Sequence, residues 1–121
     1  MKLGVWLVMT PLNTGSGNDK AYGGPGDDLL HGGEGDDHLE GNTGNDTVHG
    51  GDGNDYIEDT LDDAGNDIFD GGAGDDHIIS YGGNDVLIGG EGNDLLDGGY
   101  ISVGQTIFNG DPVISFLGRD D

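Results

Sequence analysis

Residues 32–40 read Gly-Gly-Glu-Gly-Asp-Asp-His-Leu-Glu, and residues 89–97 read Gly-Gly-Glu-Gly-Asn-Asp-Leu-Leu-Asp. The same nine-residue pattern occurs in nine copies between Thr14 and Asp97. Seven of the eight intervals between copies are nine residues long, and the eighth is twelve because three extra residues fall within 59–63. A fixed short period of this kind predicts a solenoid in which each copy is one structural unit.

Three columns of the repeat explain the expected fold. The fourth position is always Gly and the fifth is always Asn or Asp, residues that tolerate left-handed backbone, so positions one to five predict a tight turn. Positions seven to nine predict a three-residue strand whose middle side chain faces inward. That eighth position is apolar in every copy: Ala21, Leu30, Leu39, Val48, Ile57, Phe69, Ile78, Leu87 and Leu96.

Two copies complete one coil, so the predicted fold is all-β. We expect a parallel β-roll, which is a two-sheeted right-handed β-solenoid with 18 residues per coil. The expected organisation is an N-terminal strand or cap at 1–13, the nine-copy roll at 14–97 and a C-terminal capping segment at 98–121. The roll is expected to end there because Val103 stands where the next Asp belongs.

The composition predicts a chain that needs cations. It has 25 Asp and Glu against 3 Lys and Arg, a formal charge of -22, and only 31% apolar residues. Such a chain stays disordered unless its charge is neutralised. The charge excludes nucleic acid and anionic membrane surfaces as partners. Without Cys there is no disulfide, thiolate site or Cys nucleophile, and a structural metal is the usual substitute in a small domain.

Membrane insertion and a cleaved signal peptide are not expected. No apolar run approaches the ~18 residues of a spanning helix. Residues 1–9 contain a single Lys and no small-residue cleavage site, and Pro11 follows closely.

The sixth position is the candidate metal ligand. Coil stacking brings these carboxylates ~4.8 Å apart along two edges of the roll, where they repel unless a cation lies between them. Carboxylates with turn carbonyls make an all-oxygen site, which Ca²⁺ prefers over Mg²⁺ or Zn²⁺. The carboxylate ligands are Asp19, Asp37, Asp55, Asp76 and Asp94 on one edge and Asp28, Asp46, Asp67 and Asp85 on the other. The candidate carbonyl ligands are Gly24, Gly26, Gly33, Gly35, Gly51, Gly53, Gly72, Gly74, Gly90 and Gly92.

Successive acids define four slots on one edge and three on the other. Up to about seven Ca²⁺ would change the formal charge from -22 to about -8. The slots Asp55/Asp76 and Asp46/Asp67 are expected to be the weakest, because the insertion lies between their members. Copies one, four, six and eight also lose a leading Gly, at Thr14-Gly15, Gly41-Asn42, Asp62-Asp63 and Ser80-Tyr81. Ala21 fills the core poorly and predicts a frayed first coil.

These copies resemble the RTX, or hemolysin-type calcium-binding, repeat, whose pattern is G-G-x-G-x-D-x-U-x with U a large apolar residue. The resemblance covers residues 14–97. It implies a β-roll with Ca²⁺ between turns eighteen residues apart, ligated by the sixth-position Asp and by turn carbonyls. It also implies a bacterial protein exported by type I secretion without a cleaved signal peptide, which folds outside the cell.

Other polar residues favour structural interpretations. The fifth-position Asn and Asp are expected to serve backbone conformation more than metal ligation. His31 and His49 are stacked neighbours that could hold a transition metal weakly, although exposed strand positions are the favoured interpretation. His38 and His77, with Tyr56 between them, indicate no site.

An apolar row is expected on the outer face of one sheet, at Leu29, Ile68, Val86 and Ile88. Such a row should be covered. The candidates are the segments 3–9 and 100–117, which we favour as caps, or another protein.

The sequence is compatible with three functions. The leading hypothesis is a calcium-binding module that folds on binding Ca²⁺ and supports folding and secretion of an extracellular bacterial protein. The alternative is the repeat region of a secreted protease, lipase or polysaccharide epimerase whose catalytic domain is covalently attached or associated. No catalysis is expected in the chain itself, which lacks His-Glu-x-x-His and Gly-x-Ser-x-Gly. The third function is calcium-dependent adhesion or partner binding. Ice binding is not expected, because the sequence lacks the regular array of Thr residues that such a face needs.

Overall fold

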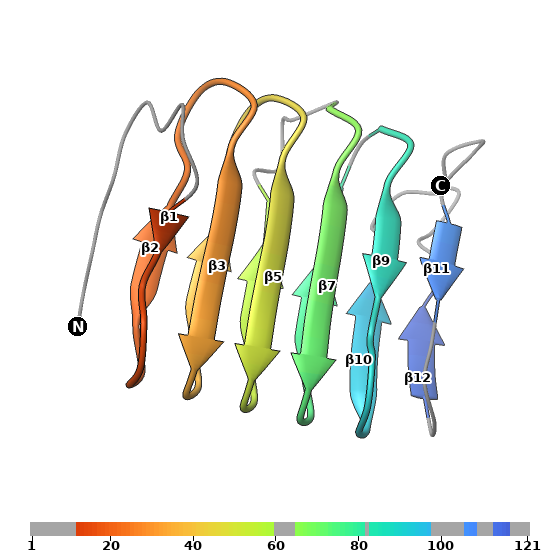
Figure 1. Cartoon of the computed structure of the whole chain (residues 1–121). Helices are drawn as coiled ribbons and strands as arrows, with labels where there is room; N and C mark the ends of the chain where they lie inside the picture. Colours follow the sequence, from red (N-terminus) through yellow and green to blue (C-terminus); the bar gives the residue numbers. More distant parts are fainter. Residues whose placement is uncertain (1–11, 60–64, 82, 98–105, 109–112, 117–121) are drawn as a thin grey trace.

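The repeats form two parallel β-sheets stacked as a flattened coil. The structure is a computed structural model, and it describes residues 12–59, 65–81, 83–97, 106–108 and 113–116. One sheet has the order β1-β3-β5-β7-β9-β11 and the other β12-β10-β8-β6-β4-β2, so the chain alternates between sheets through the repeats (Figure 1). The predicted all-β, parallel two-sheeted solenoid is confirmed, and the described residues contain no helix.

The strands are short and follow the repeat. Those of the first sheet are β1 (Leu12–Asn13), β3 (Leu29–Glu34), β5 (Thr47–Asp52), β7 (Ile68–Ala73), β9 (Val86–Ile88) and β11 (Thr106–Phe108). Those of the second are β2 (Lys20–Tyr22), β4 (His38–Glu40), β6 (Tyr56–Glu58), β8 (His77–Ile79), β10 (Asp94–Asp97) and β12 (Val113–Phe116).

Pairing confirms the period of eighteen residues per coil. Leu30 pairs with Val48 and Leu39 with Ile57, each eighteen residues apart. Across the insertion the offset becomes 21, as in Ile57 with Ile78, and the strands remain in register. Residues 60–64, next to or within the insertion, lie outside the described residues. The three extra residues therefore leave the stacking of the coils intact.

The core is a thin layer between the sheets, to which each sheet contributes one row of side chains. Every eighth-position residue from Ala21 to Leu96 has no exposed surface. Alternation along each strand turns the seventh and ninth positions outward. Ala21 is as buried as the others, and β2 pairs with β4 through all three residues. This is not the frayed end that the small side chain predicts.

Two details of the roll differ from expectation. Strands β3, β5 and β7 run for six residues instead of three, because pairing continues through Gly33 with Gly51 and Gly51 with Gly72. Strand β1 pairs in parallel with β3 at the same eighteen-residue offset as the strands of the repeats, for example Leu12 with Leu30. The stacking of the roll therefore begins before Thr14.

The segment after the repeats continues both sheets. Strand β11 pairs with β9, and β12 pairs with β10, in parallel. The described part of 100–117 therefore lies beside the last coil instead of across the outer apolar row, where Ile68 is 43% exposed. The segment 3–9 lies outside the described residues.

Candidate calcium-binding edges

The sixth-position aspartates lie at the starts of the strands and point into the roll. Each precedes the core residue of its copy by two positions, and residues two apart in extended chain share a face. All nine are buried, with at most 4% of their surface exposed. Nine carboxylates in the interior of a 121-residue chain require compensation, because burying an unpaired charge is costly.

In seven of the nine aspartates, one carboxylate oxygen accepts a hydrogen bond from the backbone of the neighbouring coil. The backbone N–H of Asp19 donates to Asp37 Oδ1 at 2.8 Å, and that of Asp37 donates to Asp55 Oδ1 at 2.9 Å. The same bond joins every predicted pair, at 2.7–3.0 Å. The seven pairs are Asp19/Asp37, Asp37/Asp55, Asp55/Asp76, Asp76/Asp94, Asp28/Asp46, Asp46/Asp67 and Asp67/Asp85.

The pairs that flank the insertion are built like the rest. The Asp55/Asp76 bond is 2.8 Å and the Asp46/Asp67 bond is 2.7 Å. In these bonds the two slots do not differ from the others, and their weaker calcium binding stays a prediction.

The second carboxylate oxygen of several edge aspartates faces a space that no hydrogen-bond donor of the described residues fills. The Oδ2 atoms of Asp28, Asp37, Asp55, Asp76 and Asp94 are buried and have no hydrogen-bond partner among the described residues. A Cβ placed on Gly32 would lie 2.5 Å from Asp37 Oδ2 and 2.6 Å from the carbonyl oxygen of Gly50 in the next coil. Two acceptor oxygens thus converge on a space that only glycine leaves open, which fits a cation that takes oxygen ligands.

The structure adds first-position carbonyls to the candidate ligands. The carbonyl of Gly50 approaches the space beside Asp37, and that of Gly41 lies 2.7 Å from the Cβ position of Gly23, beside Asp28 Oδ2. The repeat pattern predicts ligands only among the carbonyls of ten Gly residues at the second and fourth positions. Glycines at those ten positions have φ between 88° and 117°, as the turn prediction requires, and lie stacked from coil to coil.

Burial raises the pKa of five edge carboxyls, those of Asp28, Asp37, Asp55, Asp76 and Asp94. It raises the pKa of Asp28 to about 6, and that of Asp55 and Asp76 to about 7. Burial is the main cause, and the charges of neighbouring acids, such as Asp76 acting on Asp55, add to it. Without a cation these three carboxyls hold a proton more readily than a free carboxyl does, and a bound divalent ion would favour their ionised form.

Copies one and eight depart from this arrangement. Thr14 replaces the leading Gly of copy one, and its Oγ1 donates to the carbonyl of Gly32 at 2.7 Å. Ser80 replaces the leading Gly of copy eight, and its Oγ donates to Asp85 Oδ2 at 2.7 Å. In these two copies a hydroxyl therefore donates a hydrogen bond to an oxygen that has no such donor in the copies that begin with Gly.

The fifth-position residues form a second ladder. Asn18 Oδ1 accepts the N–H of Asp36 at 2.8 Å, and Asp36 Oδ1 accepts that of Asn54 at 2.8 Å. These exposed side chains tie each coil to the next, which supports the structural role expected for them.

The histidines of the first sheet are arranged as stacked neighbours. The rings of His31 and His49 lie 4.9 Å apart with an interplanar angle of 8°. Because a metal binds in the plane of an imidazole, two parallel rings cannot share one ion in this arrangement. This geometry favours the interpretation as exposed strand positions.

Fold and edges together define a parallel β-roll with oxygen-lined turns. Three segments, residues 12–39, 31–58 and 61–96, match the family model of the RTX calcium-binding nonapeptide repeat (4 copies). They cover more than half of the chain, so the chain belongs to the RTX repeat family and its roll is a calcium-binding module. Neither the curated proteins nor the solved structures gave a match. The part of the chain that the structure describes holds no helix with the length and apolar character to cross a membrane.

Proposed function

We propose that this chain is a calcium-dependent folding module of a secreted bacterial protein. Ca²⁺ between successive coils, up to about seven ions, is ligated by the sixth-position Asp and by turn carbonyls. Low cytosolic calcium keeps the chain unfolded for type I export, and extracellular calcium then folds it. The observation that carries the proposal is a set of buried Oδ2 atoms, such as those of Asp37 and Asp55, that have no hydrogen-bond partner within the described ranges.

The charge of the chain supports coupling between binding and folding. A formal charge of -22 opposes compaction, and the apolar core is a small cluster with one residue from each copy of the repeat. Because a preformed site does not exist in the unfolded chain, the binding free energy of Ca²⁺ becomes folding free energy. Sites of the strength typical of extracellular modules, with Kd of ~10⁻⁴–10⁻³ M, would give the required switch.

The test combines circular dichroism with a calcium titration of the 121-residue chain. We expect little β signal without calcium and a cooperative rise as Ca²⁺ is added, with Mg²⁺ far less effective. Isothermal titration calorimetry then counts the ions. A β signal that survives chelation unchanged would contradict the folding role.

A matched pair of variants separates ligation from general charge. Asp37→Asn removes a buried carboxylate whose Oδ2 has no hydrogen-bond partner, and Asp36→Asn removes the same charge from its exposed neighbour. Asn is already found in the fifth column, at Asn45 and Asn54, so Asp36→Asn keeps the ladder. We expect only Asp37→Asn to lose a calcium ion and to shift the folding midpoint to higher calcium. Equal effects would show that the carboxylates act through net charge alone.

A further inference from the structure

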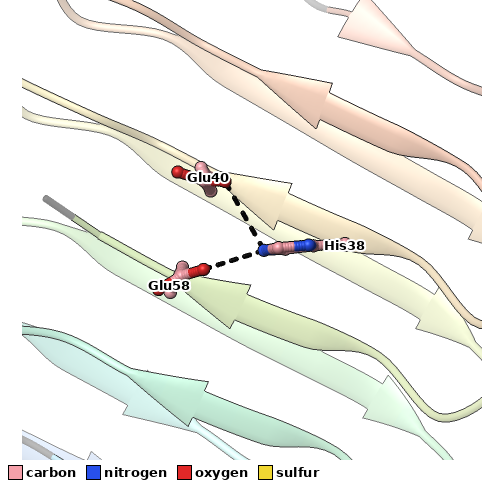
Figure 2. Close-up of side chains that lie close together, drawn as sticks. All are labelled: His38, Glu40 and Glu58. Atoms are coloured by element: carbon pink, nitrogen blue, oxygen red, sulfur yellow. Dashed lines mark hydrogen bonds and ion pairs between the residues drawn. The ribbon is translucent and has the colours of Figure 1, made fainter. Parts of the chain in front are cut away.

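A second group of metal-ligating side chains lies away from the calcium edges, on the outer face of the second sheet. His38 Nε2 lies 2.8 Å from Glu58 Oε2 and 3.5 Å from Glu40 Oε2 (Figure 2). One ligand atom from each of the three residues lies within 4.8 Å of the others. In the described part of the chain, no other three His, Cys, Asp or Glu residues meet in this way.

Strand register explains why the three residues meet. Glu40 on β4 pairs directly with Glu58 on β6, and His38 lies two residues before Glu40 on the same face. Like charges placed directly opposite each other on adjacent strands are destabilising. The pKa of Glu40 is raised, first by burial and then by the charge of Glu58. One imidazole between two carboxylates leaves an excess of negative charge that a divalent ion would neutralise.

The donor set selects the kind of ion. Imidazole nitrogen with carboxylate oxygens suits Zn²⁺, whereas Ca²⁺ takes oxygen ligands. Tetrahedral Zn²⁺ with bonds near 2.1 Å separates its ligand atoms by about 3.4 Å, close to the 3.5 Å between His38 and Glu40. Glu58 Oε2, now hydrogen-bonded to His38 Nε2 at 2.8 Å, would move away from it by about 0.6 Å when an ion binds. The side chains of His38, Glu40 and Glu58 are 31%, 22% and 24% exposed, so water can reach the group as a fourth ligand.

We propose that His38, Glu40 and Glu58 form a Zn²⁺ site on the outer face of the roll, separate from the calcium edges. The neighbouring sixth-position carboxylate, Asp37, points into the roll and is buried, so the two kinds of site lie on opposite sides of the strand. The Zn²⁺ site requires the folded sheets, because its ligands come from two strands that are eighteen residues apart in the chain.

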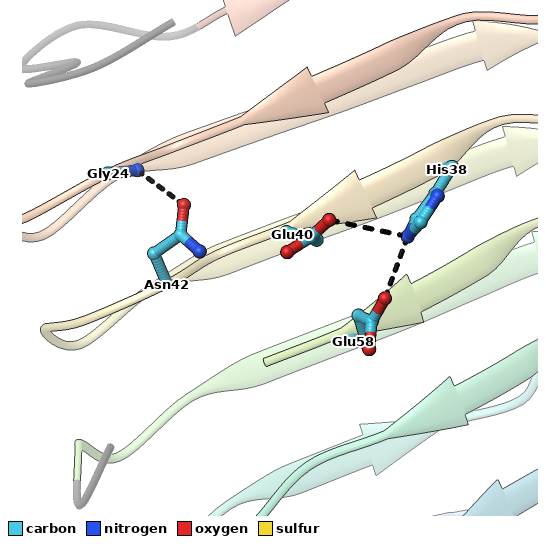
Figure 3. Close-up of polar contacts among 5 residues, drawn as sticks. All are labelled: Gly24, His38, Glu40, Asn42 and Glu58. Atoms are coloured by element: carbon cyan, nitrogen blue, oxygen red, sulfur yellow. Dashed lines mark hydrogen bonds and ion pairs between the residues drawn. The ribbon is translucent and has the colours of Figure 1, made fainter. Parts of the chain in front are cut away.

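The surroundings of the group supply both a competitor and a control. Lys20 on β2 pairs with His38. Contact with Tyr22 raises the pKa of Lys20 most, and the charges of Glu40 and Glu58 raise it further. Its ammonium therefore competes with a metal ion for these carboxylates. His77 lies beyond Tyr56 in the same row, and its ring contacts the Tyr56 ring at 5.0 Å. The Gly24–Asn42 hydrogen bond lies apart from the group (Figure 3).

The test is a Zn²⁺ titration of the chain folded in excess Ca²⁺, followed by calorimetry. We expect His38→Gln and Glu58→Gln to weaken Zn²⁺ binding by at least about tenfold, since loss of an outer partner alone costs about 10–100-fold. His77→Gln should leave the affinity unchanged, and Lys20→Met should strengthen it. Circular dichroism of each variant in Ca²⁺ verifies the fold, so loss of the site is distinguished from loss of calcium-dependent folding.

X-ray absorption at the zinc edge identifies the ligands. We expect one imidazole nitrogen among oxygen ligands in the wild-type chain, and loss of that nitrogen in His38→Gln. Three results would overturn the proposal: His38→Gln binding Zn²⁺ as tightly as the wild type, His77→Gln weakening it equally, or excess Ca²⁺ abolishing Zn²⁺ binding altogether.

Discussion

Asn42 shows how a single residue can replace glycine in the turn. It is at the second position of its copy and has φ of 73°, the left-handed region that glycine occupies in most copies. Asn tolerates this conformation better than other residues with a side chain. Its Oδ1 also accepts the N–H of Gly24 in the preceding coil at 3.0 Å (Figure 3). The missing glycine of copy four is therefore replaced by a residue suited to the same backbone.

Replacing Asn42 tests this interpretation. Asn42→Ala loses the hydrogen bond and forces a Cβ without a polar group into left-handed backbone, so it should lower the free energy of unfolding by about 1–2 kcal/mol. Asn42→Gly keeps the conformation and should cost clearly less. Urea denaturation in saturating Ca²⁺ measures both variants. Because both variants lose the hydrogen bond, an equal loss of stability in Asn42→Gly and Asn42→Ala would mean that the bond, and not the backbone strain, accounts for the effect.

The hydroxyl of Ser80 offers a test of the calcium edge. The hydroxyl donates a hydrogen bond to Asp85 Oδ2. In a copy that begins with Gly, the equivalent oxygen faces a carbonyl of the next coil, as Asp37 Oδ2 faces that of Gly50. Ser80→Gly should strengthen calcium binding at this edge, by removing both the competing donor and the Cβ. The reverse change, Gly32→Ser, would place a Cβ 2.5 Å from Asp37 Oδ2 and should weaken its slot. Calcium titration by calorimetry measures both changes. The same affinity in Ser80→Gly as in the wild type would mean that the hydroxyl does not compete.

Sequence reasoning located the acids of the site but not all of their surroundings. The period placed Asp37 and Asp55 in one row, because a fixed repeat dictates which residues stack. It could not show that one oxygen of each is used by a backbone N–H, or that the carbonyl of Gly50 approaches the other. These contacts depend on turn geometry. The spacing of the histidines does not reveal the group of His38, Glu40 and Glu58. The eighteen-residue interval between Glu40 and Glu58 is the signal that places these two carboxylates side by side.

At the level of the strands, stability depends on the inner face of each three-residue segment. Phe69 on β7 is fully buried, between Val48 and Leu87 of the neighbouring coils, while the adjacent Ile68 is 43% exposed. Phe69→Ala should lower the free energy of unfolding by about 3–5 kcal/mol through the cavity it creates. Ile68→Ala should change it by only about 0.5 kcal/mol.

Thermal unfolding in saturating Ca²⁺ checks this contrast. The two variants shorten adjacent side chains on the same strand, so strand propensity does not explain a large difference between them. A comparable loss in Ile68→Ala would mean that its face is covered, as the apolar row there led us to expect.

The strands of the repeat were predictable, and those beyond it were not. Alternation around each core residue predicted β4, β6 and β8 to the residue. The extension of β3, β5 and β7 depends on hydrogen bonds between turns, such as that from the N–H of Gly35 to the carbonyl of Asp52 at 3.0 Å. Strands β11 and β12 carry no sixth-position Asp; they pair because the last coil presents open sheet edges.

For the whole molecule, the buried acids make the calcium-free fold dependent on pH. Unfolded, these carboxyls have ordinary pKa values near 3.8, whereas in the fold the pKa is about 6 for Asp28 and about 7 for Asp55 and Asp76. Between pH 4 and pH 7 the folded chain therefore binds more protons than the unfolded chain. By linkage, its stability without calcium is greatest at low pH and is lost as the pH rises through about 7.

Acidification should thus replace part of the need for calcium. In calcium-free buffer we expect the β signal in circular dichroism to grow as the pH falls from 8 to 5, which stays above the sequence pI of about 4.1. Sedimentation verifies that the chain stays monodisperse. The double variant Asp55→Asn, Asp76→Asn removes two of the titrating groups, so it should show more β structure at pH 8 and a weaker pH dependence. A double variant with the wild-type pH profile would mean that net charge, and not these buried carboxyls, opposes folding.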